Sequence, residues 1–142
     1  MGLDEAVTPP SIVVAGIGFR RATTGAEIVA LLRRALGEAG LASGQLAAIA
    51  TAADRAGEPA VREAAAAFGL APTALDAAAL TAVDARVVTR SGRIEASRGV
   101  GSVAEAAALA CAGPAARLVL LRIASTGATC ALAVADRASN LP

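Results

Sequence analysis

The sequence predicts a single α/β domain with three layers, α/β/α, and a mostly parallel sheet that ends in an antiparallel hairpin. Short apolar runs rich in β-branched residues alternate with helical patterns for most of the 142 residues, which is typical of parallel sheets covered by helices on both faces. The length fits one domain. Near the end of the chain, two apolar runs are joined through Ser125, Thr126 and Gly127, which favours a hairpin.

Four elements are predicted in the first half of the chain. Residues 11–15 form an apolar run, closed by Gly16, and are expected to be a buried strand. Residues 24–39 are expected to be a helix, because apolar residues recur there at spacings of three and four. A second strand is expected at 46–51, and a helix that starts with proline is expected over about 59–68.

The second half is less regular. We expect a long, mobile loop over 84–101, where arginines alternate with glycine and polar residues, and such loops are often functional. The other expected elements are a short strand at 73–75, a helical turn at 76–83, a helix at 102–112 and the hairpin strands 118–123 and 128–135.

The two ends of the chain, residues 1–10 and 137–142, are expected to be flexible. The first ten residues carry two acids and no base, so a secretory signal peptide is not expected. No run of about 18 uncharged apolar residues occurs, so no membrane span is expected. The sequence therefore predicts a cytoplasmic protein with no membrane partner.

The composition excludes several classes of function. The chain has no His, Lys, Trp or Tyr, 41 residues are Ala, and all 13 basic residues are Arg. Imidazole bases, Ser-His-Asp triads, Schiff bases and histidine metal sites are therefore excluded, and two cysteines are too few for a Cys₄ zinc site. With two Phe as the only aromatic residues and a net charge of +1, nucleic acid is not an expected partner. Arg, carboxylates, hydroxyls, thiols and backbone N–H groups remain.

The first candidate site is the stretch GIGFRRATTGAE, which follows the first expected strand and opens a helix. Helix N-termini attract anions, and paired arginines offer forked donors to carboxylates or phosphates. The alternative is a plain turn in which Thr24 and Glu27 form a capping box. A dinucleotide fingerprint is not favoured, because its third glycine is replaced by Arg21. The candidate ligand-binding residues here are Gly16, Ile17, Gly18, Arg20, Arg21, Thr23 and Thr24.

The second candidate site, RGVGSVAE, has the same features: an arginine, two glycines and a helix start. Its candidate ligand-binding residues are Gly99, Gly101 and Ser102. Glu105 is a candidate general base, but Ser102 and Glu105 also match a capping box. Both interpretations of Glu105 stay open.

A third candidate site follows the second expected strand, in the loop that contains Arg55 and Glu58. Ligands of open α/β sheets bind beyond the carboxyl ends of the strands, so this loop and the first site are expected to converge. Arg55 is a candidate ligand-binding residue and Glu58 a second candidate base. A solvated surface loop is the alternative.

Cys130 offers a thiol, but the chain has no histidine to activate it. It shares one face of the last expected strand with Leu132 and Val134. We therefore expect a buried core thiol, and two reduced cysteines in the chain.

Taken together, the motifs GIGFRRATTGAEI, TAADRAGEP, GVGSVAEAAAL and ATCALAVA resemble the CobE family, which is equivalent to the C-terminal domain of CbiG. The resemblance runs from about residue 12 to residue 135. Thr129, in the last motif, joins the candidate ligand-binding residues. The sequence departs from the family at Phe19, where the family often has Cys, and at Arg55 and Arg122, where it often has Lys.

The resemblance implies a role in cobalamin (vitamin B12) biosynthesis and a corrin-ring intermediate with many carboxylates as ligand. Arginine forks suit such carboxylates, and Ala and Gly offer small, flat surfaces for the ring. No cofactor or metal bound by the protein itself is expected, so cobalt would enter only within the corrinoid. Two alternatives stay open: a hydrolase that opens a precorrin lactone, as full-length CbiG does with release of acetaldehyde, and a non-catalytic partner subunit that hands an intermediate to other pathway enzymes.

Overall fold

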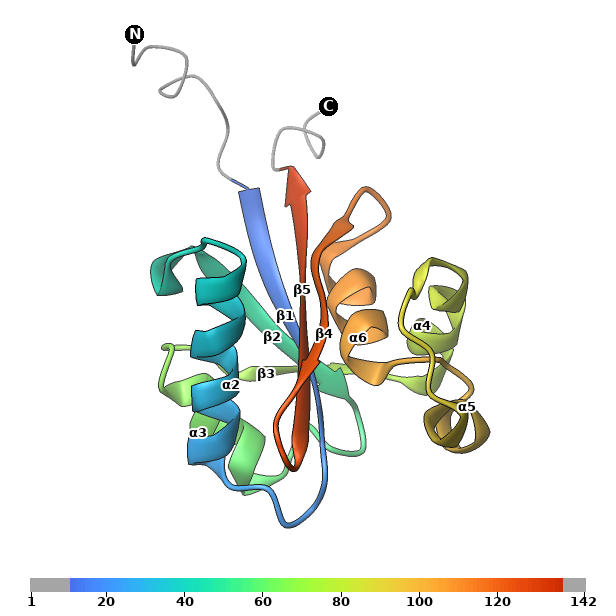
Figure 1. Cartoon of the computed structure of the whole chain (residues 1–142), viewed down its shortest axis with the longest axis horizontal. Coiled ribbons are helices and arrows are strands. Elements are labelled where there is room, and N and C mark those ends of the chain that lie inside the picture. Colours follow the sequence, from blue (N-terminus) through green and yellow to red (C-terminus); the bar gives the residue numbers. More distant parts are fainter. Residues whose placement is uncertain (1–10, 137–142) are drawn as a thin grey trace, which may run out of the picture.

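A five-stranded sheet forms the centre of the computed structural model, which describes residues 11–136 (Figure 1). The expectations for residues 1–10 and 137–142 lie outside the described residues. Along the sheet the strands follow the order β3-β2-β1-β5-β4. They are β1 (Ser11–Phe19), β2 (Leu46–Ala52), β3 (Pro72–Leu75), β4 (Arg117–Ala124) and β5 (Ala128–Asp136).

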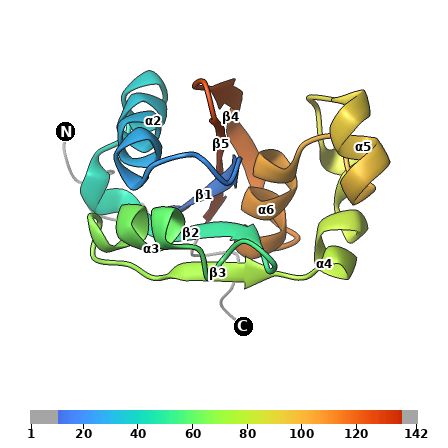
Figure 2. The same ribbon diagram turned by 90° about the horizontal axis from the view of Figure 1, so that it is seen from below.

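Helices cover both faces of this sheet, which confirms the three-layer prediction. One face carries α2 (Gly25–Glu38) and α3 (Pro59–Ala66), and the other carries α6 (Val103–Ala112), with α4 (Ala77–Ala82) and α5 (Gly92–Arg98) beside it (Figures 1 and 2). Short 3₁₀ turns, η1 (Ser43–Gln45) and η2 (Asp84–Arg86), complete the element order. Among the helices of residues 11–136, none combines the length and apolar character needed to cross a bilayer.

Strand directions match the predicted fold class. β1, β2 and β3 pair in parallel, whereas β5 runs antiparallel to both β1 and β4. β5 alone therefore opposes the other four strands. The C-terminal hairpin is confirmed, and its turn is closed by the Ser125 N–H, which donates to the Ala128 carbonyl at 2.8 Å.

The core lies on both faces of β5. Cys130, Leu132 and Val134 belong to the apolar cluster that includes buried residues of α2 and α3, and Ala133 and Ala135 belong to a cluster with residues of α6. This alternation confirms the predicted faces of the strand. The side chains under α6 are mostly alanines, which let helix and sheet approach closely.

The first strand is longer than predicted. The run was expected to end at Gly16, but β1 continues to Phe19, because its pairing with β5 extends from Ser11 to Phe19. Gly16, Ile17 and Gly18 therefore lie inside a strand and not in a loop after it. The reason for Gly16 is close packing: a Cβ there would lie 1.9 Å from the Ala104 carbonyl oxygen of α6.

The long loop expected over 84–101 is also corrected, because this segment contains η2 and α5. Ser91 caps α5 by accepting a hydrogen bond from the Ile94 N–H, and Gly99 ends the helix at φ 75°, a left-handed conformation that glycine adopts without strain. Ser91 and Gly99 are helix signals that the interleaved arginines obscured. The other predicted elements agree with the structure to within a few residues.

Candidate functional site

A cleft of about 920 Å³ opens at the carboxyl ends of β1 and β2. Its walls are the start of α6, the inner side of α5 and the turn of the β4–β5 hairpin. Ligand sites of open α/β sheets occur at this edge. Several of the lining residues are small or apolar, among them Gly18, Phe19, Ala52, Val103 and Ala128.

The charge of the lining is strongly positive. Five arginines line the cleft, namely Arg20, Arg55, Arg93, Arg98 and Arg122. Asp54 is the one acidic residue among the lining residues, so their formal charge is five minus one, or +4. The whole chain carries only +1, so the fold concentrates positive charge at this edge of the sheet.

Two of these arginines already have partners. Arg98 donates through both terminal nitrogens to Asp54, at 2.7 and 3.1 Å. Arg55 pairs with Glu58 at 2.9 Å, and its guanidinium carbon lies 5.4 Å from the centre of the Phe19 ring. The other three arginines of the lining make no ion pair with any residue of 11–136. They are available to an anion in the cleft.

The predicted first site divides between the cleft and the interior. Arg20 and Gly18 line the cleft, whereas Arg21 is exposed outside its lining. Ile17 is fully buried and its carbonyl accepts a hydrogen bond from Thr51 Oγ1 at 2.7 Å. Gly16 faces α6, as described above.

Thr23 and Thr24 hold the local backbone. Thr23 Oγ1 donates to the Gly127 carbonyl at 2.8 Å, and Thr24 is the N-cap of α2, where it accepts from the Glu27 N–H at 3.1 Å. In the alternative of a capping box, the Glu27 carboxylate would accept from the Thr24 N–H, but it accepts instead from the Ser125 hydroxyl and the Gly127 N–H. Both hydrogen bonds lower the pKa of Glu27, and the one from Ser125 has the larger effect. They also hold the hairpin turn that forms one wall of the cleft.

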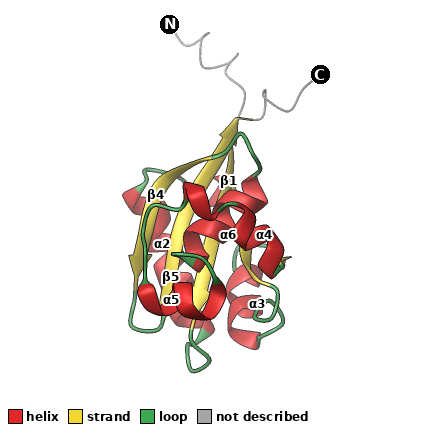
Figure 3. Cartoon of the chain, turned by 90° about the vertical axis from the view of Figure 1, so that its right-hand side faces the viewer, coloured by secondary structure: helices red, strands yellow, loops and turns green. Residues whose placement is uncertain are grey.

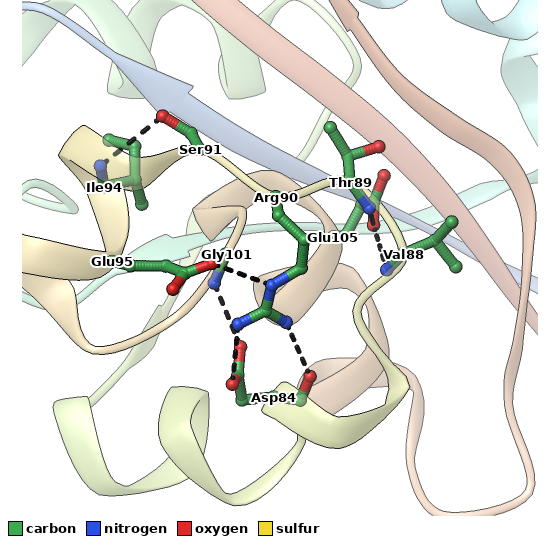
Figure 4. Close-up of polar contacts among 9 residues, drawn as sticks. All are labelled: Asp84, Val88, Thr89, Arg90, Ser91, Ile94, Glu95, Gly101 and Glu105. Atoms are coloured by element: carbon green, nitrogen blue, oxygen red, sulfur yellow. Dashed lines mark hydrogen bonds and ion pairs between the residues drawn. The ribbon is translucent and has the colours of Figure 1, made fainter.

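The glycines of the second predicted site have structural roles within the protein. Gly99 ends α5, and the Gly101 N–H donates to Asp84 Oδ1 at 2.9 Å. The space beside Gly101 is filled by Arg90, because a Cβ on this glycine would lie 2.6 Å from Arg90 Nε (Figure 4). Ser102 lines the cleft and caps α6.

Glu105 is fully buried and does not line the cleft. One carboxylate oxygen accepts from the Val88 and Thr89 N–H groups at 2.8 and 2.9 Å, and the other accepts from the Arg122 N–H at 2.9 Å (Figure 4 shows the first two). Burial raises the pKa of Glu105, but the backbone hydrogen bonds from Arg122, Thr89 and Val88 outweigh it, and the pKa is lowered. This carboxylate ties α6 to β4 and to the segment before α5.

The predicted third site reaches the cleft through Arg55 and not through Glu58, which lies outside the lining. Arg20 and Arg55, from the loops after β1 and β2, lie on the same cleft, as the strand-end argument expected. Thr129 also lines it and donates to the Gly18 carbonyl at 3.4 Å.

Comparison with known proteins decides the family. The model of the family described as "Cobalamin synthesis G C-terminus" matches residues 13–133. The chain belongs to this family. Membership confirms the resemblance to CobE and the C-terminal domain of CbiG, and it gives this CbiG C-terminal family protein a role in cobalamin biosynthesis.

Individual relatives agree. Protein CobE of Sinorhizobium sp. is 42% identical over 121 residues, which cover 85% of this chain and 79% of the relative. The crystal structure of CobE, a protein from the cobalamin biosynthetic pathway, has a TM-score of 0.83 at 35% identity and covers 90% of this chain and 93% of CobE. The crystal structure of cobalamin biosynthesis protein chiG from Agrobacterium tumefaciens has a TM-score of 0.70 at 34% identity, and the match covers 87% of this chain and 98% of chiG.

Phe19, Arg55 and Arg122, the three positions singled out when the resemblance to the family was described, all line the cleft. Phe19 and Arg55 contact each other there, with the guanidinium over the ring.

Some residues of the site were missed from the sequence. Arg93 is absent from the predicted site residues, and Arg98 is present only as the first residue of the motif RGVGSVAE. Both arginines lie in the segment 84–101, for which a loop was expected. Arg122 had a signal too, because it is a single charge within the apolar run LVLLRIA. Thr51 gave no signal, since it lies at the end of an otherwise apolar strand.

Both cysteines of the chain are free thiols. Cys130 is fully buried, and this burial raises its pKa to about 12. Cys111 is half-buried, which also raises its pKa. Neither thiol lines the cleft. Within residues 11–136, no group of three or more His, Cys, Asp or Glu side chains is placed to hold a metal ion.

Thiol labelling checks this description. Because the thiolate is the reactive form, the folded protein at pH 8 is expected to react with Ellman's reagent slowly and at Cys111 only, and denatured protein should release two equivalents. Fast reaction of both thiols in the folded state would contradict the burial of Cys130.

Proposed function

We propose that this protein binds a corrin-ring intermediate of cobalamin biosynthesis through the carboxylates at the edge of the ring, in the cleft beyond β1 and β2. The observation that carries the proposal is the lining charge of +4 from five arginines and one aspartate. Three of the arginines, Arg20, Arg93 and Arg122, have no ion-pair partner among the described residues. Guanidinium groups bind carboxylates through forked, charge-assisted hydrogen bonds.

Other parts of the lining suit the same ligand. The N-terminus of α6, capped by Ser102, opens on the cleft and adds partial positive charge. Phe19, Ile94 and Val103 provide apolar surface between the charges. This combination of an apolar surface with arginines around it matches a flat ring that carries acidic side chains.

The hydrolase alternative stays a prediction and gains no support from the site. Its two candidate bases, Glu58 and Glu105, both lie outside the cleft lining. Glu58 is paired with Arg55, and both oxygens of Glu105 accept backbone hydrogen bonds. The partner-subunit alternative, in which the protein hands an intermediate to another enzyme, requires the same binding step that we propose.

Arg20→Ala and Arg21→Ala form a matched pair for testing the site. Both arginines are exposed neighbours, but only Arg20 lines the cleft. In a visible-absorbance titration with a carboxylated corrin ring, Arg20→Ala is expected to weaken binding about fivefold to tenfold, which corresponds to the loss of about 1–1.4 kcal/mol, the contribution of one hydrogen bond at an exposed position. It should also reduce the dependence of affinity on salt.

Arg21→Ala is expected to change the affinity less than about twofold, because an exposed charge away from the ligand is screened. Equal losses in the two variants would show that the arginines act only through net charge. Unchanged affinity in Arg20→Ala would place the ligand elsewhere.

A further inference from the structure

An ion pair crosses the cleft between Asp54, in the loop after β2, and Arg98, the last residue of α5. Arg98 Nη1 donates to Asp54 Oδ1 at 2.7 Å, and Nη2 donates to Oδ2 at 3.1 Å. This is the forked arrangement in which arginine binds any carboxylate. Both residues line the cleft. The guanidinium of Arg98 is thus already engaged as a carboxylate receptor.

The partner of Arg98 is easily displaced. The Asp54 side chain is 65% exposed, against 28% for Arg98, so releasing this carboxylate to water costs little. The hydrogen bond from Arg98 lowers the pKa of Asp54, which keeps the carboxylate ionised at neutral pH. An external carboxylate offers Arg98 the same two acceptor oxygens as Asp54 does.

Helix α5 is the wall of the cleft that depends on such polar contacts. None of its residues is buried, and Ile94 is its one member in the apolar clusters of the described residues, where it is only partly buried. Its other attachment is through Arg90, which pairs with Asp84 at 3.0 Å and with Glu95 of α5 at 2.8 Å (Figure 4). Exposed ion pairs contribute little to stability. α5 lies at the periphery of the molecule, with α6 between it and the sheet (Figure 2), and it lies in front of the sheet when the molecule is viewed from that side (Figure 3).

We infer that Asp54 is an internal competitor for the ligand: it occupies Arg98 in the free protein, and a carboxylate of the incoming ligand replaces it and binds α5 in its place. The identity of the ligand rests on the proposed function, but the competition requires only a carboxylate. Asp54 thereby sets the threshold for binding, because a weakly acidic or neutral molecule gains nothing from displacing it.

Substitutions of Asp54 and of Arg98 should therefore change the affinity for a carboxylate in opposite directions. Asp54→Asn frees Arg98 and removes the one negative charge from the lining, so carboxylate binding becomes tighter. Arg98→Gln removes the receptor, so binding becomes weaker. If the pair served only to hold α5 in place, both variants would loosen the same wall and change the affinity in the same direction.

Citrate is the probe, since it is a small tricarboxylate that does not depend on the identity of the natural ligand. In isothermal titration calorimetry, Asp54→Asn is expected to bind citrate about fivefold tighter than the unaltered chain, and Arg98→Gln about fivefold weaker, the size expected for one hydrogen bond of ordinary strength. The control is Glu38→Gln, which breaks the exposed Arg34–Glu38 pair of α2 (2.9 Å) with the same change of charge outside the cleft. Its affinity should stay within about twofold of the unaltered chain.

Hydrogen exchange gives a second measurement. The amides of α5 should exchange faster in Asp54→Asn than in the unaltered chain, and citrate should slow them again, because its carboxylate takes the place of Asp54. A purely structural ion pair would give no recovery with citrate. Arg98→Gln should show fast exchange with and without citrate.

Three results would overturn the inference: weaker citrate binding in both cleft variants, no citrate binding by Asp54→Asn, or a gain in that variant no larger than in Glu38→Gln. Failure of a corrinoid to bind, with the citrate results as expected, would instead count against the proposed function and leave the competition between Asp54 and a carboxylate standing.

Discussion

Replacing Gly16 with Ala is expected to lower the free energy of unfolding by about 3 kcal/mol, the upper part of the usual range for overpacking a core. The added Cβ would lie 1.9 Å from the Ala104 carbonyl oxygen and 2.6 Å from the Ala108 N, both backbone atoms of α6. Backbone cannot rotate away as a side chain can, so α6 must move off β1. Urea unfolding followed by circular dichroism measures the effect.

Gly37→Ala is the matched control. Gly37 lies in α2, and nothing lies within 4 Å of the position that its Cβ would take. The same added methyl group should therefore raise the free energy of unfolding by up to about 1 kcal/mol, because alanine favours helix over glycine. If Gly16→Ala unfolds at the same urea concentration as the unaltered chain, the close contact between β1 and α6 is wrong.

Loss of the Glu105 carboxylate is expected to have an effect of similar size. Glu105→Ala leaves the N–H groups of Val88, Thr89 and Arg122 without this acceptor, and we expect a loss of about 4 kcal/mol, since each buried unpaired donor costs about 1–3 kcal/mol and the terms are not additive. Glu105→Gln keeps the shape and one acceptor oxygen, so about half of that loss is expected.

The same carboxylate predicts a dependence of stability on pH. The pKa of Glu105 is lowered in the folded protein from its ordinary value of 4.5, so the folded state binds the proton less readily than the unfolded state. Its contribution is complete above pH 4.5 and is lost as the pH falls through the lower folded pKa. Urea unfolding at pH 7 and pH 3.5 should show a smaller acid loss in Glu105→Gln than in the unaltered chain. If both proteins lost the same free energy of unfolding between pH 7 and pH 3.5, Glu105 would not be the group responsible for the acid loss.

The fold class could be predicted from the sequence because its signals are local. The β-branched run before Gly16, the spacing of Ile28, Leu31 and Leu32 in α2, and the small turn at 125–127 each report on neighbouring residues. Alternation of Cys130 with its neighbours even gave the correct faces of β5. Where local signals conflicted, as in the arginine-rich segment that contains α5, the prediction failed.

Three contacts between distant segments could not be predicted. Gly16 in a GxG motif suggests a ligand-binding turn, but the partner that comes close to it is α6, some 90 residues further along the chain. Glu27 and Glu105 each lie three residues after a helix cap, so a capping box was the alternative interpretation at both positions. Both instead accept hydrogen bonds from remote backbone, at the hairpin turn and at β4. The sequence around each glutamate does not indicate these distant hydrogen-bond donors.

The site was predicted in part for a related reason. Arg20 and Arg55 follow the first two parallel strands, so the strand-end rule placed them at one edge. Arg122 reaches the cleft from β4, near an irregularity in the pairing of β4 with β5. No spacing within the chain expresses that irregularity, so the sequence could not place Arg122 on the cleft.

The most direct measurement of the central claim compares two forms of one ligand. The protein is titrated, by visible absorbance, with a corrin ring whose acetate and propionate groups are free acids, and then with the same ring in which they are amides. Binding of the acid form, with at least a tenfold loss for the amide form, is the predicted result, since about 1.4 kcal/mol corresponds to tenfold and several charge-assisted hydrogen bonds disappear. Equal affinity for the two forms, or no spectral change with the acid, would contradict carboxylate recognition by the arginines of this cleft.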